Sequence, residues 1–156
     1  MTSWRATLRE ALITGSVASI ASALTLLIAG RVEPQRPAAP VNAISHWLWG
    51  DGALHKDKPT VRHTLTGYLI HHAASIFWAL LHAQAWNRRH KAVRPLPAMA
   101  TAAATAGVAC FVDFQLTPHR LTPGYEYRLS RPALAGVYAS FALGLAVGTL
   151  LAGRRR

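Results

Sequence analysis

Three histidines lie in one helix-length apolar segment, residues 64–86 (TLTGYLIHHAASIFWALLHAQAW), which carries no formal charge. They are His71, His72 and His82. An imidazole is costly to place in hydrocarbon, so an ionisable residue in such a segment suggests a functional site with a partner to be named. The candidate partner is Asp113, the only acid inside any of the long apolar segments.

A helical wheel places the polar residues of this segment on one stripe, which should face the interior of a helical bundle. If the next apolar segment is antiparallel to it, Asp113 lies near the level of residues 68–72. An Asp113–His71 hydrogen bond or ion pair is therefore expected near the outer surface. The predicted polar site consists of His71, Asp113, His72, Tyr68 and Ser75. His82 lies about three turns further along and is expected at the inner interface, beside Trp86.

Four segments are long enough to cross a bilayer, which takes about 20 predominantly apolar residues. They are residues 11–30, 64–86, 97–116 and 132–153. Uninterrupted apolar helices of this length are unusual in soluble proteins, whose surface helices show a polar face. The sequence therefore predicts an all-α protein: one integral membrane four-helix bundle over residues 1–156, with outer loops at 31–63 and 117–131.

The formal net charge of +11 would suggest nucleic-acid binding in a soluble domain. Here the basic residues lie at segment ends, where they determine orientation in a membrane. The N-terminus, residues 87–96 and the C-terminus carry the denser set of Lys and Arg. We expect both termini to be cytoplasmic in the bacterial inner membrane, with the bilayer rather than nucleic acid as the partner.

Small residues recur every fourth position in the last apolar segment, at Gly136, Ser140, Gly144 and Gly148. In lipid, helices associate through small side chains that let backbones approach. This ladder could serve packing within the chain, or it could form the seam of a homo-oligomer. A membrane partner subunit is the other expected kind of protein partner.

Two aromatic, proline-containing loops are expected on the side of Asp113 and His71. One contains VNAISHWLWGDGALHKD, in which Asn42 could cap a short helix, and the other is LTPHRLTPG. They could lie along the interface, or they could form a lid over a polar pocket. The lid residues would be His46, Asp51, His119 and Arg120.

No catalytic motif is recognisable: the chain lacks a P-loop, a dinucleotide fingerprint, a nucleophile elbow and HExxH. No cofactor is predicted, and the interpretation leans away from an enzyme. Three functions stay open. They are a proton- or stress-linked membrane component, in keeping with the chemistry of imidazole, a small transporter or channel, and a haem- or metal-binding redox protein using the outer histidines.

The order of these features resembles the YagU-type inner-membrane proteins, a family associated with acid resistance. The shared features are a leading apolar helix, a proline-rich connection, a histidine-containing second helix, a third helix that ends in Leu116-Thr117-Pro118, and a final helix. The chain is also similar to small proteobacterial membrane proteins with phrases such as APVNAISHWLWGD and LTPHRLTPG. The resemblance implies a multi-pass membrane protein and lends support to a proton-linked role.

Overall fold

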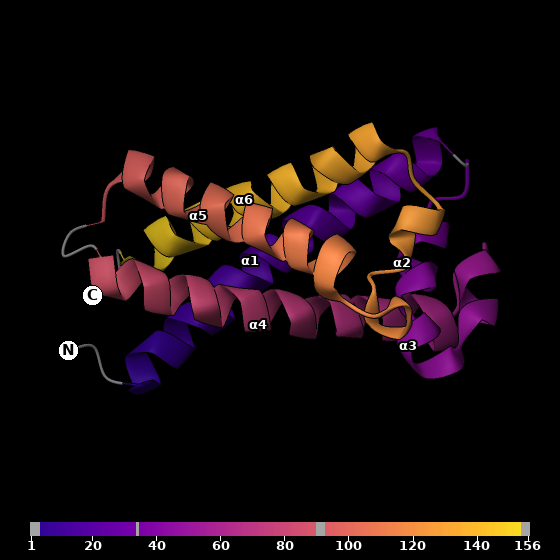
Figure 1. Ribbon diagram of the computed structural model, residues 1–156, viewed down its shortest axis with the longest axis horizontal. Helices are drawn as coiled ribbons and strands as arrows, with labels where there is room; N and C mark the ends of the chain where they lie inside the picture. The colour runs from indigo at the N-terminus through magenta and orange to yellow at the C-terminus, as the bar shows by residue number, and fades with distance from the viewer. Residues whose placement is uncertain (1–3, 34, 90–92, 154–156) are drawn as a thin grey trace.

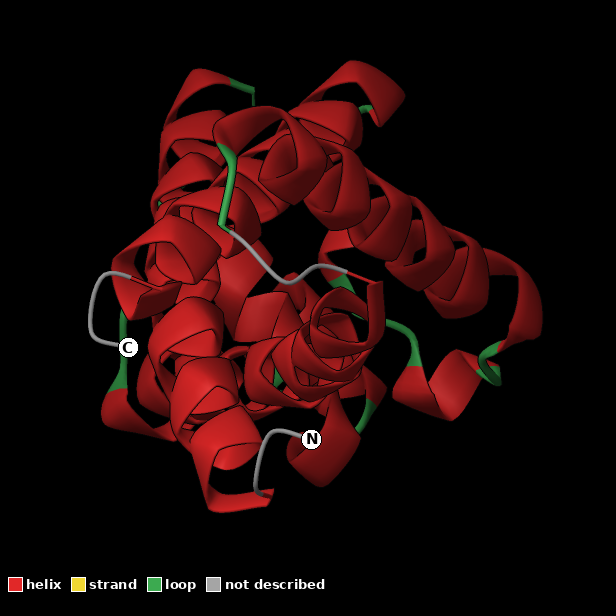
Figure 2. Ribbon diagram, turned by 90° about the vertical axis from the view of Figure 1, so that its left-hand side faces the viewer, coloured by secondary structure: helices red, strands yellow, loops and turns green. Residues whose placement is uncertain are grey.

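Four long helices run alongside one another in the computed structural model, which describes residues 4–33, 35–89 and 93–153 (Figure 1). They are α1 (Trp4–Val32), α4 (Thr66–Arg89), α5 (Pro95–Phe111) and α6 (Arg131–Gly153). The end view in Figure 2 shows helices throughout and no strand in the described part of the chain. The all-α prediction is confirmed.

The predicted segments coincide with these helices, although the boundaries differ. α1 begins at Trp4, well before residue 11, while a π-helical turn, η2 (Val61–Leu65), leads into α4 and another, η3 (Val112–Leu116), extends α5. Three stretches are long and apolar enough to cross a membrane: Trp4–Val32, Pro95–Leu116 and Arg131–Gly153. α4 is not among them, because its histidines, Gln84 and Asn87 lower its mean hydropathy.

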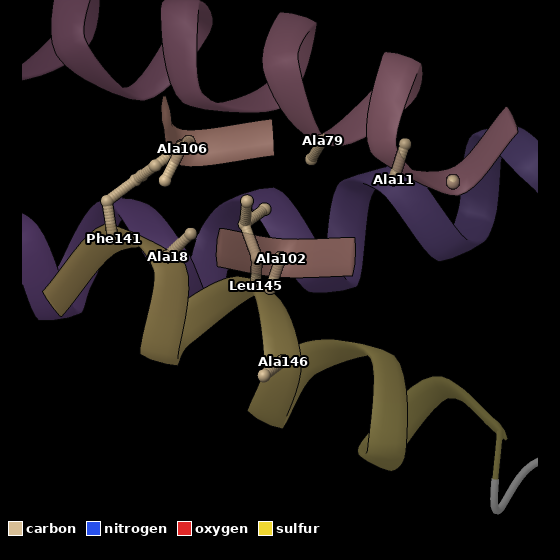
Figure 3. Packing of buried hydrophobic residues seen from close by; sticks show 9 residues of the cluster. Ala11, Ala18, Ala79, Ala102, Ala106, Phe141, Leu145 and Ala146 are labelled. Carbon is tan, nitrogen blue, oxygen red and sulfur yellow. The ribbon is translucent and has the colours of Figure 1, made fainter. Parts of the chain in front are cut away.

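The centre of the bundle is built mainly from alanine (Figure 3). Ala11 and Ala18 of α1, Ala79 of α4 and Ala102 of α5 are completely buried. Phe141 and Leu145 of α6 are the large side chains of this cluster. Small side chains let the helix backbones approach closely, which is the usual basis of helix packing in membranes.

The closest approach that the glycines of α6 make is to α1. A Cβ atom added at Gly144 would lie 2.4 Å from the Cα of Ala18, and one at Gly148 would lie 2.5 Å from the Cα of Thr14. Gly136 has no neighbour within 4 Å of such an atom, and the Ser140 hydroxyl bonds to its own helix at the Val137 carbonyl.

The expected four-residue ladder is therefore wrong as a single continuous face. Four residues turn an α-helix by about 400°, so each step drifts by about 40° around the axis. Over the three steps from Gly136 to Gly148 this drift carries the first glycine away from the face that contacts α1. Of the three glycines in this ladder, Gly144 and Gly148 are the ones whose backbone meets α1.

The long helices contact one another in the order α4, α1, α6, α5. α1 packs extensively along both α6 and α4, and α5 packs along α6. Contact between α4 and α5 is much less extensive. The bundle is consequently a ring that is closed tightly on three sides and loosely on the fourth.

A cap of short helices covers one end of the bundle, the end opposite the start of α1 and the end of α6 (Figure 1). Its elements are α2 (Ala39–Ile44), α3 (His46–Trp49), η1 (Asp51–His55), η4 (His119–Leu121) and η5 (Tyr125–Tyr127). Asn42 lies inside α2, so it does not cap a helix. Its buried amide instead donates to the carbonyls of Lys56 and Lys58 and accepts from the Thr64 hydroxyl.

Polar contacts tie the two outer loops of the cap together. The Trp47 indole donates to the Thr122 carbonyl at 2.8 Å, and Asp57 pairs with both Arg36 and Arg128. These bonds join residues far apart in sequence. They hold the cap in place over this end of the bundle, where it forms a roof; cap and roof are the same elements.

Replacing Gly144 with alanine is expected to lower the free energy of unfolding by about 1–3 kcal/mol, because the new methyl group overlaps the α1 backbone. Gly136→Ala is the matched control on the same helix. It should leave stability unchanged or raise it by up to about 1 kcal/mol, since alanine favours helix more than glycine. Unfolding by sodium dodecyl sulfate in mixed micelles measures both. Equal effects of the two substitutions would contradict this account of the α1–α6 contact.

Candidate functional site

A cavity of about 490 Å³ lies beneath the roof, in the outer half of the bundle. Most of its wall is apolar, with contributions from all four long helices and from the roof. The polar side chains that line it are Ser22, His71, Ser75, Asp113, Thr117, Tyr125 and Tyr138. A concave apolar space with a few convergent polar groups is the usual form of a small-molecule site.

His71 lies in the second turn of α4 and reaches the cavity from that helix. Its Nε2 lies 2.8 Å from the Ser22 hydroxyl of α1. That hydroxyl also lies 2.8 Å from the Ala18 carbonyl, to which it donates its single proton. The Nε2 atom is therefore the protonated nitrogen in this arrangement, and it donates to Ser22. The Ser75 hydroxyl donates to the backbone carbonyl of His71 and so stays on its own helix.

Asp113 lies in η3, where the π-helical turn extends α5 beneath the roof. Its Oδ2 accepts a hydrogen bond of 2.5 Å from the Tyr138 hydroxyl of α6. Tyr138 in turn accepts from the hydroxyl of Tyr125, which is buried in the roof, at 3.2 Å. The result is a chain of donors, Tyr125 to Tyr138 to Asp113, which runs from the roof into the cavity wall.

Burial raises the pKa of Tyr125 well above its usual value, and the nearby carboxyls of Asp113 and Glu126 raise it further. Tyr125 therefore stays a neutral donor at the head of the chain. Both carboxyl oxygens of Glu126 are buried without a hydrogen-bond partner among the described residues. Sequence reasoning did not single out Tyr125, Tyr138 or Glu126.

The predicted pair is brought to one cavity, but not into one hydrogen bond. His71 bonds to Ser22 of α1, and Asp113 bonds to Tyr138 of α6. The expectation of a direct Asp113–His71 bond is therefore wrong. The antiparallel pairing of α4 and α5 gives the two residues a common level, but helix rotation lets each meet a different neighbour.

Tyr68 and His72 do not line the cavity. Their rings contact each other, with centroids 5.8 Å apart, and Tyr68 packs against the cluster around Leu26. The Nδ1 atom of His72 is buried without a hydrogen-bond partner in the described part of the chain. Of the five predicted site residues, the cavity wall contains His71, Asp113 and Ser75.

None of the four predicted lid residues lines the cavity. His46 is fully buried, and its Nδ1 lies 2.9 Å from the Ala43 carbonyl. Its ring meets that of the exposed His119, and Arg120 donates to the Trp47 carbonyl. Asp51 is exposed. The inner surface of the roof is formed instead by Ile44, Trp47, Leu121, Pro123 and Tyr125.

The physical reason is that the roof covers an apolar space. Its apolar side chains face the cavity, while its polar side chains hold the loops to one another. The cap does cover the cavity, but the four residues predicted to face the cavity do not line it.

His82 is buried in the bundle rather than placed at the inner interface. Its Nδ1 lies 3.1 Å from the Thr105 hydroxyl of α5, and its Nε2 lies 2.9 Å from the Thr149 hydroxyl of α6. The imidazole therefore links three helices in the inner half. The two threonines inside otherwise apolar segments were the available sequence signal, because a buried imidazole needs hydrogen-bond partners.

In the described part of the chain, no three His, Cys, Asp or Glu side chains are grouped so that they could hold a metal ion. His46 and His119 come together in the roof without a third such ligand.

The chain matches no family model, and comparisons with curated proteins and with solved structures found no match.

Proposed function

We propose that the chain is a multi-pass protein of the bacterial inner membrane in which α4 crosses the bilayer together with α1, α5–η3 and α6. The exposed stripe of α4 supports this proposal. The described exposed residues of α4, namely Leu69, Ala73, Phe77 and Leu81, are all apolar, although Ala73 and Phe77 also line the rim of the outer cavity. The polar side chains His71, Ser75 and His82 face other helices or the cavity. A helix with an apolar exterior and a polar interior suits lipid rather than water.

The orientation that we propose places both termini in the cytoplasm and the cap outside. The start of α1, the end of α4, the start of α5 and the end of α6 lie at one end of the bundle (Figure 1). In the sequence, nine of the 17 Lys and Arg residues lie in short stretches within or next to these helix ends. The cap end contains the other eight, spread over longer loops. Dense positive charge close to helix ends favours the cytoplasmic side.

Cysteine labelling tests the span of α4 in the full chain. In a Cys110→Ala background, Asp51→Cys in the cap should react with a membrane-impermeant maleimide on intact spheroplasts. Arg94→Cys, at the start of α5, should react only after permeabilisation. Both positions are exposed. Labelling of both from the same side would contradict the proposal, because α4 would then not cross the membrane.

We propose that the outer cavity binds a small, mostly apolar molecule with a hydrogen-bond-donating or positively charged group. One observation carries this proposal: Asp113 and His71 converge on a roofed apolar cavity of about 490 Å³. Among the described residues, Asp113 is the only acidic side chain in the cavity wall, and no Lys or Arg lines it. Such a wall favours a donor or a cation and disfavours a phosphate or carboxylate.

Tyr138 supports the role of Asp113 by fixing one of its oxygens. The hydrogen bond to Oδ2 fixes the orientation of the carboxyl group in the cavity wall before a ligand binds. A preorganised acceptor loses little conformational freedom on binding. His71, held by Ser22, lies in the same wall and can contact the ligand from α4.

Dansylcadaverine, an apolar fluorophore with an amine, serves as the cationic probe, and the dansylamide of pentylamine is its neutral counterpart. In nanodiscs, Asp113→Asn should weaken binding of the cation at least about tenfold, equivalent to about 1.4 kcal/mol, with a smaller effect on the neutral compound. The exposed Asp51→Asn is the control and should leave both affinities unchanged. Wild-type affinity of Asp113→Asn for the cation would contradict the proposal.

A second candidate, proton-linked transport, is favoured by the donor chain from Tyr125 through Tyr138 to Asp113. This chain leads from the roof to a carboxyl group that could accept a proton. His71 lines the same cavity, and its imidazole is a second group that can exchange a proton. The wall would then hold two proton-accepting groups inside the membrane.

Proton entry into reconstituted vesicles tests this second candidate, with a pH-sensitive dye inside and acid outside. The wild-type protein should raise the rate of acidification severalfold over protein-free vesicles, and Asp113→Asn should lower it toward that background. Asp51→Asn should acidify at the wild-type rate. Equal rates with and without the wild-type protein would exclude the candidate.

A further inference from the structure

A second hollow lies on the same seam between α4 and α5, below the outer cavity. Its volume is about 470 Å³, and its wall is formed by α4 and α5 alone. Trp78 lines both this groove and the outer cavity. The two spaces are therefore neighbours that share one wall residue.

Small residues keep the groove open. Ala85 of α4 and Ala100 and Ala104 of α5 line it, and their side chains do not fill the space between the two helices. α4 and α5 also have much less contact than the other adjacent pairs, and Figure 1 shows them well separated at their inner ends. Leu81 and Val108, also in the wall, are 40% and 55% exposed. The groove therefore opens toward the lipid.

The groove extends the outer cavity along the bundle axis. His71 and Ala85 mark the two ends of this path on α4, and fourteen residues of helix correspond to about 21 Å. This length exceeds half of the hydrocarbon thickness of a bilayer, which is about 15 Å. A small ligand in the outer cavity would therefore occupy only the upper part of this path and would leave the groove unfilled.

We propose that the two spaces form one binding path for a single-chain amphiphile, with the head group in the outer cavity and the alkyl chain in the α4–α5 groove. This inference rests on the proposed function, in which the outer cavity binds a donor or cationic group. Trp78 lines both spaces, so the two parts are neighbours along α4. The described residues of the lower wall carry no charge, and their polar side-chain atoms come from Thr101, Thr105 and the indole of Trp78.

The charge of the wall selects the head group. Among the residues that the structure describes, no Lys or Arg lines the outer cavity, where the head group would lie. Asp113 at the outer end offers an acceptor for an amine or a hydroxyl. The occupant is therefore a long-chain amine or alcohol rather than a phospholipid.

The position of the chain can be mapped with a hexadecylamine that carries a photoreactive diazirine at the chain end. After irradiation in nanodiscs, mass spectrometry should find adducts concentrated on residues 97–108 and 81–85. A short hexylamine probe of the same design should label the outer cavity instead. Comparable labelling of exposed lipid-facing residues on α6, such as Leu143 and Leu151, would show that the chain lies in bulk lipid.

Two tryptophan substitutions on adjacent residues supply the matched comparison. Ala104→Trp fills the groove from its wall and should reduce the long-probe adducts at residues 97–108 at least threefold. Ala103→Trp lies on an exposed position that does not line the groove and should leave them unchanged. Equal adduct yields in the two variants would overturn the inference.

The short probe separates failure of this inference from failure of the proposed function. Hexylamine binding that depends on Asp113, together with indifference of the long probe to Ala104→Trp, would leave the outer site standing and remove the groove. Loss of Asp113 dependence for both probes would remove the proposed function itself.

Discussion

The close contact between α1 and α6 is the constraint on which the rest of the structure depends. In lipid, an apolar surface gains little by leaving its surroundings, so helices associate through close packing and buried polar bonds. Gly144 and Gly148 bring the α6 backbone against Ala18 and Thr14. No larger residue at these two positions would allow the same distance between the helices.

This contact determines where the bundle can be open. With α1 and α6 in close contact, α4 packs on α1 and α5 packs on α6. The remaining side, between α4 and α5, closes only partly, and both hollow spaces lie there. The cavity thus follows from the weaker packing between α4 and α5 than between the other adjacent helices.

The polar side chains between α4 and α5 differ in their partners between the two halves of the bundle. In the inner half, His82 of α4 bonds to Thr105 of α5 and to Thr149 of α6, so one imidazole links α4 to both helices beside the groove. In the outer half, His71 and Asp113 bond instead to α1 and α6. Each binds away from the seam, and the space between them stays available to a ligand under the roof.

The sequence predicts the helices and the level of the site well, because both depend on distances along the chain. Apolar length located all four long helices, and antiparallel pairing brought His71 and Asp113 to one cavity. The rotation of each helix about its own axis could not be predicted from the sequence. The partners Ser22 and Tyr138, the drift of the ladder at Gly136 and the inner face of the roof all depend on angles fixed by tertiary packing.

α4 shows why average hydropathy is a poor guide to such a helix. The residues that lower its average, His71 and His82 among them, bond to Ser22 of α1 and to threonines of α5 and α6. Its exposed residues, from Leu69 to Leu81, are apolar. In the membrane arrangement that we propose, the cost of placing these imidazoles in hydrocarbon is offset only when the partner helices are present. In that arrangement α4 is the helix whose stability depends most on the others, and its loose contact with α5 lies beside the proposed ligand site.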